Sequence, residues 1–513
     1  MRLLRLKLKG KYRSLNNFDQ TFRTAEGPAK SIEPICFVGL NGTGKSNVVE
    51  ALSEIFCYLE LICLPYKSVR KKAKTTNLSF EIAYELPADG KKGYRHILIS
   101  KLDSKEPAFF EVIEGDRHKI ESPEDKLAAL PSRIIGYSSG LNEVISVSFL
   151  RNQSYYSQEV RERAIYSTYL EPVLNTRTLY MDYESNAAIV LANYMFRTKR
   201  ELALFKRLLR IEDVSSFRLT VQFKPRGRSD HVKRTPELDD YVERLKKCSQ
   251  FCERNESLDG WTFDYRVNKE TRGAFRHYFQ SANKLFVALY KLSLLNALAL
   301  TREEREYYRR ASTKEDLREK PPEVSAKEKI FRIDKLKLRI SQPRREIDYL
   351  GISDGEHQLL HVVGTVMMFD EPGCLFLLDE PETHLNPEWR VLFGQILNEI
   401  AANRKQEFLI SSHSPFILSD CHGRNVFHFR RKGQYINCGK SEIETYGASF
   451  DYLLTRFFDL PALISEKAIR EMEEVIKAGD LAQLQDAVSQ FGESFEKRYL
   501  YEKIAELKAK SKR

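Results

Sequence analysis

The chain has 513 residues, of which 42% are hydrophobic and 30% charged, a balance typical of a soluble globular protein with a large buried core. No run of about 18 apolar residues occurs, and the N-terminal residues 1–6 alternate charge and leucine without an apolar stretch, so neither a membrane span nor a secretion signal is expected. The formal net charge of +11 suits an acidic partner such as nucleic acid.

Short alternating segments open the chain and predict strands. They lie at 3–8, around Phe18 and Phe22, at 77–86 and at 96–101, and a small antiparallel sheet is their natural home. The apolar run 35–38 predicts a buried strand, and 132–137 predicts another strand of the core.

The residues 39–46 read Gly-Leu-Asn-Gly-Thr-Gly-Lys-Ser and match the phosphate-binding loop pattern G-x-x-x-x-G-K-[ST]. A predicted strand precedes this loop and a predicted helix, 46–60, follows it, which is the context that the pattern requires. Lys45 is expected to reach the β- and γ-phosphates of ATP, and the Ser46 hydroxyl to bind Mg²⁺. The expected ATP-binding residues are Gly39, Asn41, Gly42, Thr43, Gly44, Lys45, Ser46 and Asn47.

The middle of the chain, from about Val147 to Leu300, has mostly helical spacing, clearest at 197–210 and 271–300. Residues 196–248 hold 15 lysines and arginines against 8 aspartates and glutamates, which fits either a phosphate-facing surface or a solvated helical face. The charged segment 302–329 carries Pro321-Pro322 and is expected to be a linker.

The eight cysteines are scattered, and several sit in apolar runs. Cys248 and Cys252 are four apart on a predicted helix, but no second pair stands at zinc spacing. We therefore expect reduced thiols and a cytoplasmic location.

Strands return in the second half at 330–340, 375–378 and 407–411, the last two as buried parallel strands. Asp379 and Glu380 follow the strand 375–378 directly. Asp379 is placed to support Mg²⁺, and Glu380 to accept a proton from an attacking water.

Two further motifs flank this acidic pair. Ser353-Asp354-Gly355-Glu356 stands before an apolar helix, where small residues form an anion-binding helix end. His413 follows the strand 407–411 within Ser-Ser-His-Ser-Pro, where it would touch a γ-phosphate.

As an ordered set, these motifs resemble the ABC-type ATPases of the SMC, RecF and OLD kind, over roughly residues 1–145 and 335–430. The resemblance implies that Lys45, Glu380 and His413 are catalytic, with Glu380 as general base and His413 as switch histidine. It implies that Ser46 and Asp379 hold the metal. It also implies that Ser353, Gly355 and Glu356 form a signature that caps the ATP of a second subunit, so that a homodimer sandwiches two ATP molecules. The family's glutamine after the strand 132–137 has no counterpart here, and Ser139 or Asn142 would replace it.

Two local stretches, 135–143 and 445–454, look like the PtuA-type ATPases of Septu and retron anti-phage systems. That resemblance implies an HNH nuclease partner of the PtuB type and, in the retron form, a reverse transcriptase with its RNA–DNA product. Only 100 residues follow His413, without an Asp-x-Asp pair, so the chain is expected to hydrolyse ATP but to carry no nuclease site of its own.

The expected fold is α/β: an ABC-type ATPase head with a parallel or mixed sheet, an antiparallel β-subdomain, a mainly helical insertion and a helical tail. The expected units are the first half of the head (1–146), a basic insertion (147–334), the second half of the head (335–435) and a partner-docking tail (436–513). The apolar residues Phe450, Leu453, Leu454, Phe457 and Phe458 suit either a docking surface or packing on the head.

Two other functions fit the same motifs. One is a DNA-repair or chromosome-maintenance ATPase that clamps duplex DNA on its basic insertion. The other is a nucleotide-locked scaffold with negligible turnover.

Overall fold

The structure is a computed structural model, and it describes residues 1–23, 33–64, 78–88, 93–102, 105–139, 145–166, 173–224, 231–301, 303–304, 307, 324–433, 435–460 and 464–510. Asn142 and most of the expected linker 302–329 lie outside the described residues.

A seven-stranded sheet forms the centre of the molecule, with the strand order β11-β10-β17-β18-β5-β19-β20. All neighbours in this sheet are parallel except β19 and β20. Its strands are β5 (Ile35–Val38), β10 (Ile134–Ser138), β11 (Thr178–Tyr180), β17 (Leu375–Asp379), β18 (Glu407–Ser412), β19 (Val426–Lys432) and β20 (Tyr435–Lys440). The predicted strands at 35–38, 132–137, 375–378 and 407–411 are confirmed, and the last two pair directly.

The central strands are apolar throughout because both faces of the sheet are covered. In β17, Leu375 and Leu377 pack in one core cluster while Phe376 and Leu378 pack in another. The first cluster joins the sheet to α1 (Lys45–Cys63) and to the N-terminal antiparallel sheet. The second joins it to helices α5 (Tyr183–Phe196), α9 (Ala282–Leu294), α11 (Asp354–Met368) and α12 (Pro387–Ala401).

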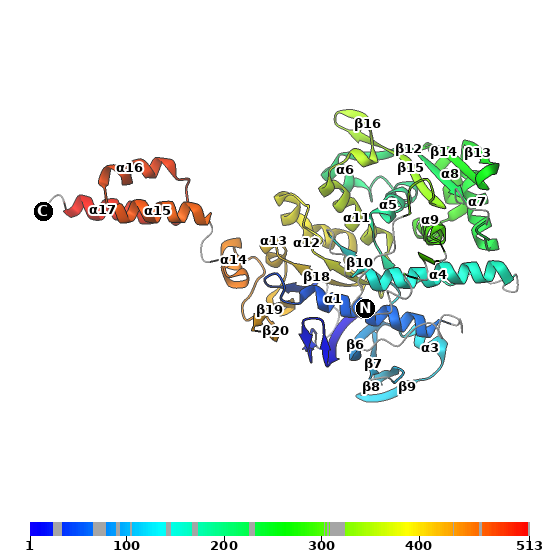
Figure 1. Ribbon diagram of the computed structural model, residues 1–513, viewed down its shortest axis with the longest axis horizontal. Helices are drawn as coiled ribbons and strands as arrows, with labels where there is room; N and C mark the ends of the chain where they lie inside the picture. Colours follow the sequence, from blue (N-terminus) through cyan, green and yellow to red (C-terminus); the bar gives the residue numbers. More distant parts are fainter. Residues whose placement is uncertain are drawn as a thin grey trace.

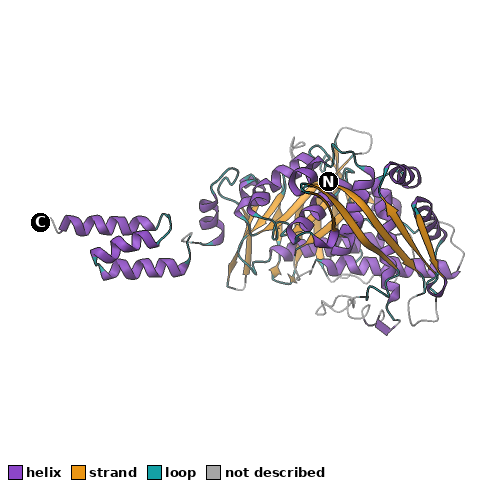
Figure 2. Cartoon of the chain, turned by 90° about the horizontal axis from the view of Figure 1, so that it is seen from above, coloured by secondary structure: helices purple, strands orange, loops and turns teal. Residues whose placement is uncertain are grey.

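The N-terminal antiparallel sheet is six-stranded, in the order β4-β1-β6-β7-β8-β9, as the alternating segments predicted. It lies on the far side of α1 from the central sheet (Figures 1 and 2). Its strands are β1 (Arg2–Lys9), β4 (Asp19–Thr21), β6 (Ser79–Pro87), β7 (Tyr94–Lys101), β8 (Ala108–Ile113) and β9 (Asp116–Ile120). A small hairpin, β2 (Lys11–Tyr12) and β3 (Leu15–Asn16), branches from it, and α3 (Pro123–Ala128) follows.

The segment from Val147 to Leu300 is mostly helical, as predicted, but its middle also contains strands. Residues 211–266 supply three strands of a five-stranded antiparallel sheet with the order β13-β14-β12-β15-β16. These strands are β12 (Ile211–Gln222), β13 (Phe251–Asn255), β14 (Gly260–Arg266), β15 (Phe331–Ser341) and β16 (Arg344–Asp348). The signal was present, because Trp261, Phe263 and Tyr265 alternate with polar residues, which is a strand pattern.

Helices α6 (Ala203–Leu209), α7 (Pro236–Cys248) and α8 (Lys269–Phe279) pack beside this sheet, whereas α4 (Ser146–Tyr166) packs on α1 and β11. The pair Cys248 and Cys252 is split between the end of α7 and β13, because Ser249 ends the helix in extended conformation. All eight cysteines lie in the described part of the chain, and none of them forms a disulfide.

The chain ends in helices. The first, α14 (Phe450–Phe458), packs on α13 (Pro415–Ser419), and its Leu453, Phe457 and Phe458 are buried in the large core cluster. Packing on the head, rather than an exposed docking surface, therefore accounts for these three apolar residues.

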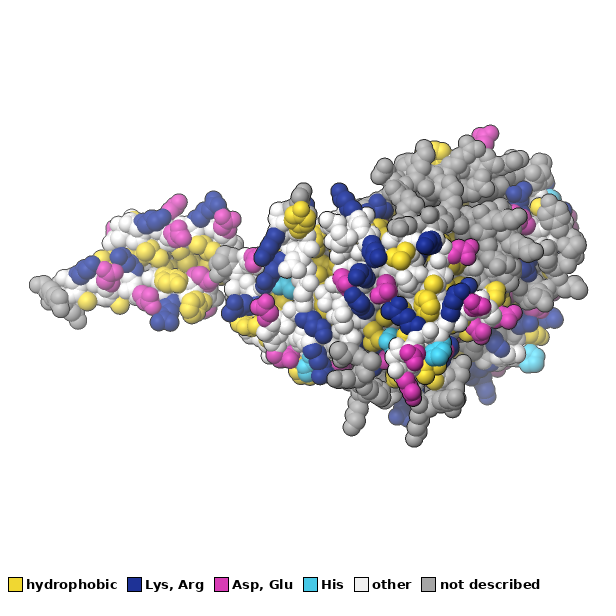
Figure 3. Space-filling view, turned by 90° about the horizontal axis from the view of Figure 1, so that it is seen from below, with side chains coloured by type: hydrophobic (Ala, Val, Ile, Leu, Met, Phe, Trp, Pro, Cys, Tyr) yellow, Lys and Arg dark blue, Asp and Glu magenta, His cyan; other side chains and the backbone are white. Residues whose placement is uncertain are grey.

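Residues 464–510 form a separate C-terminal unit that stands away from the body of the molecule (Figures 1 and 2). Its helices are α15 (Glu466–Ala478), α16 (Leu481–Gln490) and α17 (Lys497–Lys510), in agreement with the predicted helical tail. Its own small core contains Met472, Leu484, Leu500 and Ile504. Figure 3 shows apolar side chains gathered on one face of this unit between charged ones.

Two strands cross the expected unit boundaries, since β15 spans residue 334 and β20 continues the central sheet past residue 435. Within the described residues, no helix has both the length and the apolar character needed to cross a membrane.

Candidate functional site

The glycines of the phosphate loop connect β5 to α1 through backbone conformations that other residues rarely adopt. Gly39 has a φ of 143°, and a Cβ there would lie 2.2 Å from the carbonyl oxygen of Phe429 in β19. Gly44 caps the N-terminus of α1 with a φ of 91°. A glycine is therefore required at both positions, and the loop keeps the N-terminus of α1 open toward an anion.

Lys45 is folded into this loop. Its Nζ donates to the carbonyl oxygens of Gly39, at 2.9 Å, and Leu40, at 3.1 Å, and the residue is 4% exposed. Burial lowers the pKa of Lys45 to about 8, against the opposing effect of the Glu380 and Asp379 carboxylates. Neutral carbonyls compensate the buried ammonium only partly, so a phosphate group is a fitting ligand for it.

A cluster of oxygen atoms lies beside the lysine, at the carboxyl ends of β17 and β18. Asp379 Oδ1 accepts a hydrogen bond from Ser46 Oγ at 3.1 Å and another from Ser411 Oγ. Burial raises the pKa of Asp379, and the hydrogen bond from Ser411 opposes this. Hydroxyl and carboxylate oxygens are the ligands that Mg²⁺ prefers, so Ser46 and Asp379 fit the metal that the sequence implied.

Glu380 turns away from the strand because its φ is 50°. Its backbone N–H donates to the Ser411 carbonyl at 3.0 Å, and its side chain remains 37% exposed. The carboxylate oxygen Oε1 of Glu380 lies 3.3 Å from His413 Nε2. The carboxylate is thus fixed at its backbone and open to water, as a general base must be.

The ring of His413 is neutral at pH 7. Burial, and secondly the charge of Lys45, lower the pKa of His413 to about 4. The ring contacts Phe458 of α14, with ring centroids 6.4 Å apart.

Ser139 lies next to this pair, at the end of β10. Its Oγ donates to Thr383 Oγ1 at 2.9 Å, and Thr383 Oγ1 donates to the Glu380 carbonyl at 3.0 Å. Ser139, one of the two expected replacements for the family's glutamine, therefore lies beside the segment that carries Glu380.

The other expected ATP-binding residues differ in their surroundings. Asn41 and Gly42 are exposed at the tip of the loop, and Thr43 Oγ1 donates to the Leu40 carbonyl at 2.7 Å. Asn47 accepts a hydrogen bond from Ser14 of the β2–β3 hairpin and donates to Glu50 at 3.4 Å. The amide of Asn47 thus positions the hairpin against α1.

The signature segment caps α11. Ser353 is the N-cap, and Glu356 accepts hydrogen bonds from the Ser353 N–H and Oγ, each at 2.8 Å. This capping box leaves Ser353 exposed and engages the Glu356 carboxylate within the helix end. A Cβ on Gly355 would lie 2.6 Å from the His384 carbonyl, so this glycine allows α11 to approach the segment that follows Glu380.

Three polar residues near the site did not follow from the sequence motifs. Arg13, at the turn of the β2–β3 hairpin, donates to Glu50 of α1 at 3.0 Å. Ser411 binds Asp379, as described above. Glu382 is buried, accepts a hydrogen bond from Ser412 Oγ, and has its pKa raised to about 7, chiefly by burial. The run of serines before His413 was the available signal for the last two.

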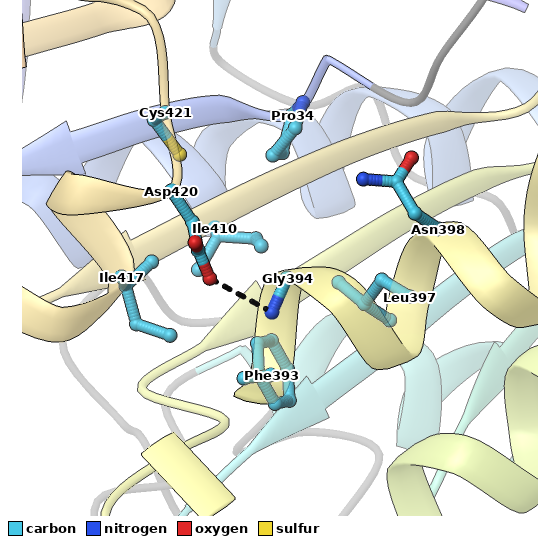
Figure 4. A pocket seen from close by; sticks show the side chains of 9 residues that line it. All are labelled: Pro34, Phe393, Gly394, Leu397, Asn398, Ile410, Ile417, Asp420 and Cys421. Carbon is cyan, nitrogen blue, oxygen red and sulfur yellow. Dashed lines mark hydrogen bonds between the residues drawn. The ribbon is translucent and has the colours of Figure 1, made fainter. Parts of the chain in front are cut away.

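A small cavity lies elsewhere. It has a free volume of about 20 Å³ and is lined by Pro34, Phe393, Gly394, Leu397, Asn398, Ile410, Ile417, Asp420 and Cys421 (Figure 4). Its walls come mainly from α12 and from α13 and its C-terminal end, and include no residue of the phosphate loop.

Comparisons with known proteins bear on part of the chain. Residues 182–419 match the family described as "AAA domain, putative AbiEii toxin, Type IV TA system". This stretch, a little under half of the chain, is therefore similar to an AAA domain. The matched stretch includes Ser353, Asp379, Glu380 and His413.

Two individual proteins are similar. Protein ea59 of Escherichia phage lambda is 28% identical over 109 residues, which are 21% of this chain and 21% of that protein. The chain thus spans about a fifth of the length of this curated relative. The SMC head domain from Thermotoga maritima is 12% identical, with a TM-score of 0.33 over 86% of this chain and 100% of that one.

Proposed function

We propose that the chain is an ATP hydrolase that works as a homodimeric, nucleotide-gated switch. The observation that carries this proposal is the meeting of three separate segments at one place. Ser46 of α1 lies 3.1 Å from Asp379, and Glu380 lies 3.3 Å from His413, beside the buried ammonium of Lys45.

Each group has one role. Lys45 and the loop N–H groups hold the triphosphate, and Ser46 and Asp379 hold Mg²⁺, which neutralises phosphate charge when bound. Glu380 accepts the proton of the attacking water, and His413 orients Glu380 from the other side. This assignment follows from geometry, because Glu380 is the carboxylate that remains accessible to water.

The solvent exposure of two expected ATP-binding segments supports the homodimer. The loop tip at Asn41 and Gly42 and the N-cap at Ser353 are both open to solvent. Within the described residues, no hydrogen bond joins residues 353–356 to residues 39–46. The two halves of an ATP site would therefore be completed by a second copy of the chain.

Mixing two inactive variants tests the dimer. Lys45→Ala removes phosphate binding, and Ser353→Arg blocks the exposed helix end. In a dimer of one copy of each variant, one of the two ATP sites combines an unmutated phosphate loop from one copy with unmutated residues 353–356 from the other. We expect each variant alone to be inactive and an equimolar mixture to recover about a quarter of wild-type phosphate release.

Two outcomes oppose the dimer. A mixture that stays as inactive as its components shows that the two segments do not act across a subunit boundary. Full activity of Ser353→Arg alone shows that residues 353–356 take no part in turnover.

A second part of the proposal concerns the protein that this chain binds. We infer that an HNH nuclease binds the C-terminal region and that the two proteins act in an anti-phage system of the Septu or retron type. In a retron system, a reverse transcriptase and its RNA–DNA product would be further partners. The sequence resemblance and the separate C-terminal unit with its apolar face support this. The eight cysteines, which form no disulfide, support a cytoplasmic setting.

Co-purification separates this partner from the alternative, a DNA clamp. A stoichiometric small HNH protein bound to the chain supports the nuclease partner. Tight, salt-sensitive binding of long duplex DNA by the chain alone supports the clamp, which the basic residues of 196–248 favour.

A further inference from the structure

We infer that α14 couples the nucleotide site to the C-terminal unit through Phe458, a positioning residue for His413. This inference rests on the proposed function, because it concerns how the same site communicates with the rest of the chain. Four observations support it.

Phe458 connects α14 to the expected catalytic groups. Its ring lies 6.4 Å from the ring of His413, at an angle of 40°, and the residue is 8% exposed. His413 Nε2 also lies 3.3 Å from Glu380 Oε1. The imidazole therefore has both an apolar ring of α14 and the proposed general base as neighbours.

A second set of contacts joins α14 to the helix that follows His413. Helix α13 starts at Pro415, and its Phe416 meets Phe450 of α14 with ring centroids 4.4 Å apart. Ser419, at the end of α13, donates to the Ala448 carbonyl at 3.0 Å and accepts from the Gly447 N–H at 2.9 Å. The histidine and the helix after it thus share one packing partner.

Helix α13 borders the small cavity described above. Figure 4 shows Ile417 and Asp420 on one side of this cavity and Phe393 and Gly394 of α12 on the other. The carboxylate of Asp420 accepts a hydrogen bond from the Gly394 N–H at 3.1 Å. The C-terminal end of α13 is therefore tied to α12, with only a small space beside it.

Beyond α14, the next described element is the first helix of the C-terminal unit. Asp459 ends α14 in the left-handed conformation, with a φ of 52°. The unit has a core of its own and stands away from the body (Figure 1). A rotation of α14 therefore moves the last described residues before the unit, and ATP binding at His413 becomes a signal that a docked partner can read.

Hydrogen exchange of the full-length chain tests the coupling. Wild type, Phe458→Leu and Phe457→Leu are compared with and without Mg²⁺ and a non-hydrolysable ATP analogue. Phe457 is the matched control, since it is equally buried in α14 but contacts His428, at 4.9 Å, instead of His413. Steady-state hydrolysis by the same three proteins gives a second readout.

In wild type we expect the analogue to slow exchange about five- to tenfold in residues 39–46 and in 450–460. Phe458→Leu keeps the protection at 39–46, loses it at 450–460, and lowers kcat with little change in KM. Phe457→Leu keeps both protections.

The other outcomes overturn the inference in distinguishable ways. Protection at 39–46 without any change at 450–460 in wild type refutes the coupling alone. Equal loss in both leucine variants shows that Phe458 has only a packing role. Absence of protection at 39–46 in wild type refutes the proposed ATP site, and the coupling with it.

Discussion

At the scale of single residues, the proposed hydrolysis depends on the Glu380 carboxylate, which is fixed at its backbone but open to solvent at its tip. Glu380→Gln keeps the shape and removes the base. We expect kcat for phosphate release to fall by about 10²- to 10³-fold, because proton transfer to a positioned base contributes this much. Equilibrium binding of ATP should change little.

Glu388→Gln, on the exposed first turn of α12, is the control and should keep full activity. If Glu380→Gln turns over as fast as wild type, Glu380 is not the base. If both variants and wild type release no phosphate, the scaffold alternative is correct.

Glu382 makes stability depend on pH. Its pKa is raised to about 7 in the folded chain, chiefly by burial, from an ordinary value of 4.5. Between these values the folded state binds more protons than the unfolded state, so the stability contributed by this group is lost as pH rises through 7. Glu382→Gln removes the titration.

We therefore expect the melting temperature of Glu382→Gln, relative to wild type, to rise between pH 5 and pH 8. A gain of about 2 kcal/mol corresponds to roughly 2–4 °C. Thermal unfolding at several pH values measures the difference. A constant gap between the two proteins across this range contradicts the raised pKa.

The residues that carry motifs could be predicted from the sequence, but their neighbours could not. Lys45, Ser46, Asp379, Glu380 and His413 occur in spacings that chemistry restricts, and the structure brings them together. Ser411 does not stand out, because its role depends on the register that places it opposite Asp379 in adjacent strands. Such a contact requires knowledge of the strand order, which no local pattern contains.

At the scale of elements, the close approach of α11 to the segment after Glu380 depends on Gly355, which has no side chain. In Gly355→Ala, the new Cβ would lie 2.6 Å from the His384 carbonyl, and backbone atoms must move to admit it. We expect phosphate release to fall by about tenfold or more while ATP binding at Lys45 persists, because a displacement of about 1 Å at a positioned group is costly.

Gly351→Ala is the matched control, because a Cβ at Gly351 meets no atom within 4 Å. It should retain wild-type turnover. If Gly355→Ala is as active as Gly351→Ala, close packing of α11 on this segment is not needed for hydrolysis.

Strands with one clear hydrophobic pattern could be predicted from the sequence, and strands that mix charged and apolar residues could not. The apolar strands β17 and β18 are short runs that both faces of the sheet bury, so their sequence is unambiguous. By contrast, β12 carries Glu212, Asp213 and Arg218 among its apolar residues. Because segments with helical spacing flank it in the sequence, the prediction assigned it to a helical region. Its partners β14 and β15 supply the pairing that settles its conformation.

At the scale of the whole molecule, the C-terminal unit should unfold on its own. It has about 50 residues and a core of few buried side chains, which is a marginal size for independent stability. Leu484 is fully buried in that core. Leu484→Ala should cost about 2–5 kcal/mol and unfold the unit while the head stays folded.

Hydrogen exchange measures this separation. Loss of protection restricted to 464–510, with unchanged protection in β17 and β18, is the expected result. Leu484→Ala that also destabilises the central sheet shows that the unit and the head unfold as one.

The central sheet also sets the time at which the ATP site forms during synthesis. Strand β5 enters the phosphate loop, yet its partners on both sides are β18 and β19, whose residues 407–432 emerge far later. At ribosomal rates, this delay is on the order of half a minute. A nascent chain therefore presents the phosphate loop without its sheet, and the proposed ATP affinity would be acquired only when translation has passed β19. Nucleotide binding by a nascent chain would thus report that the strands around the loop have been made.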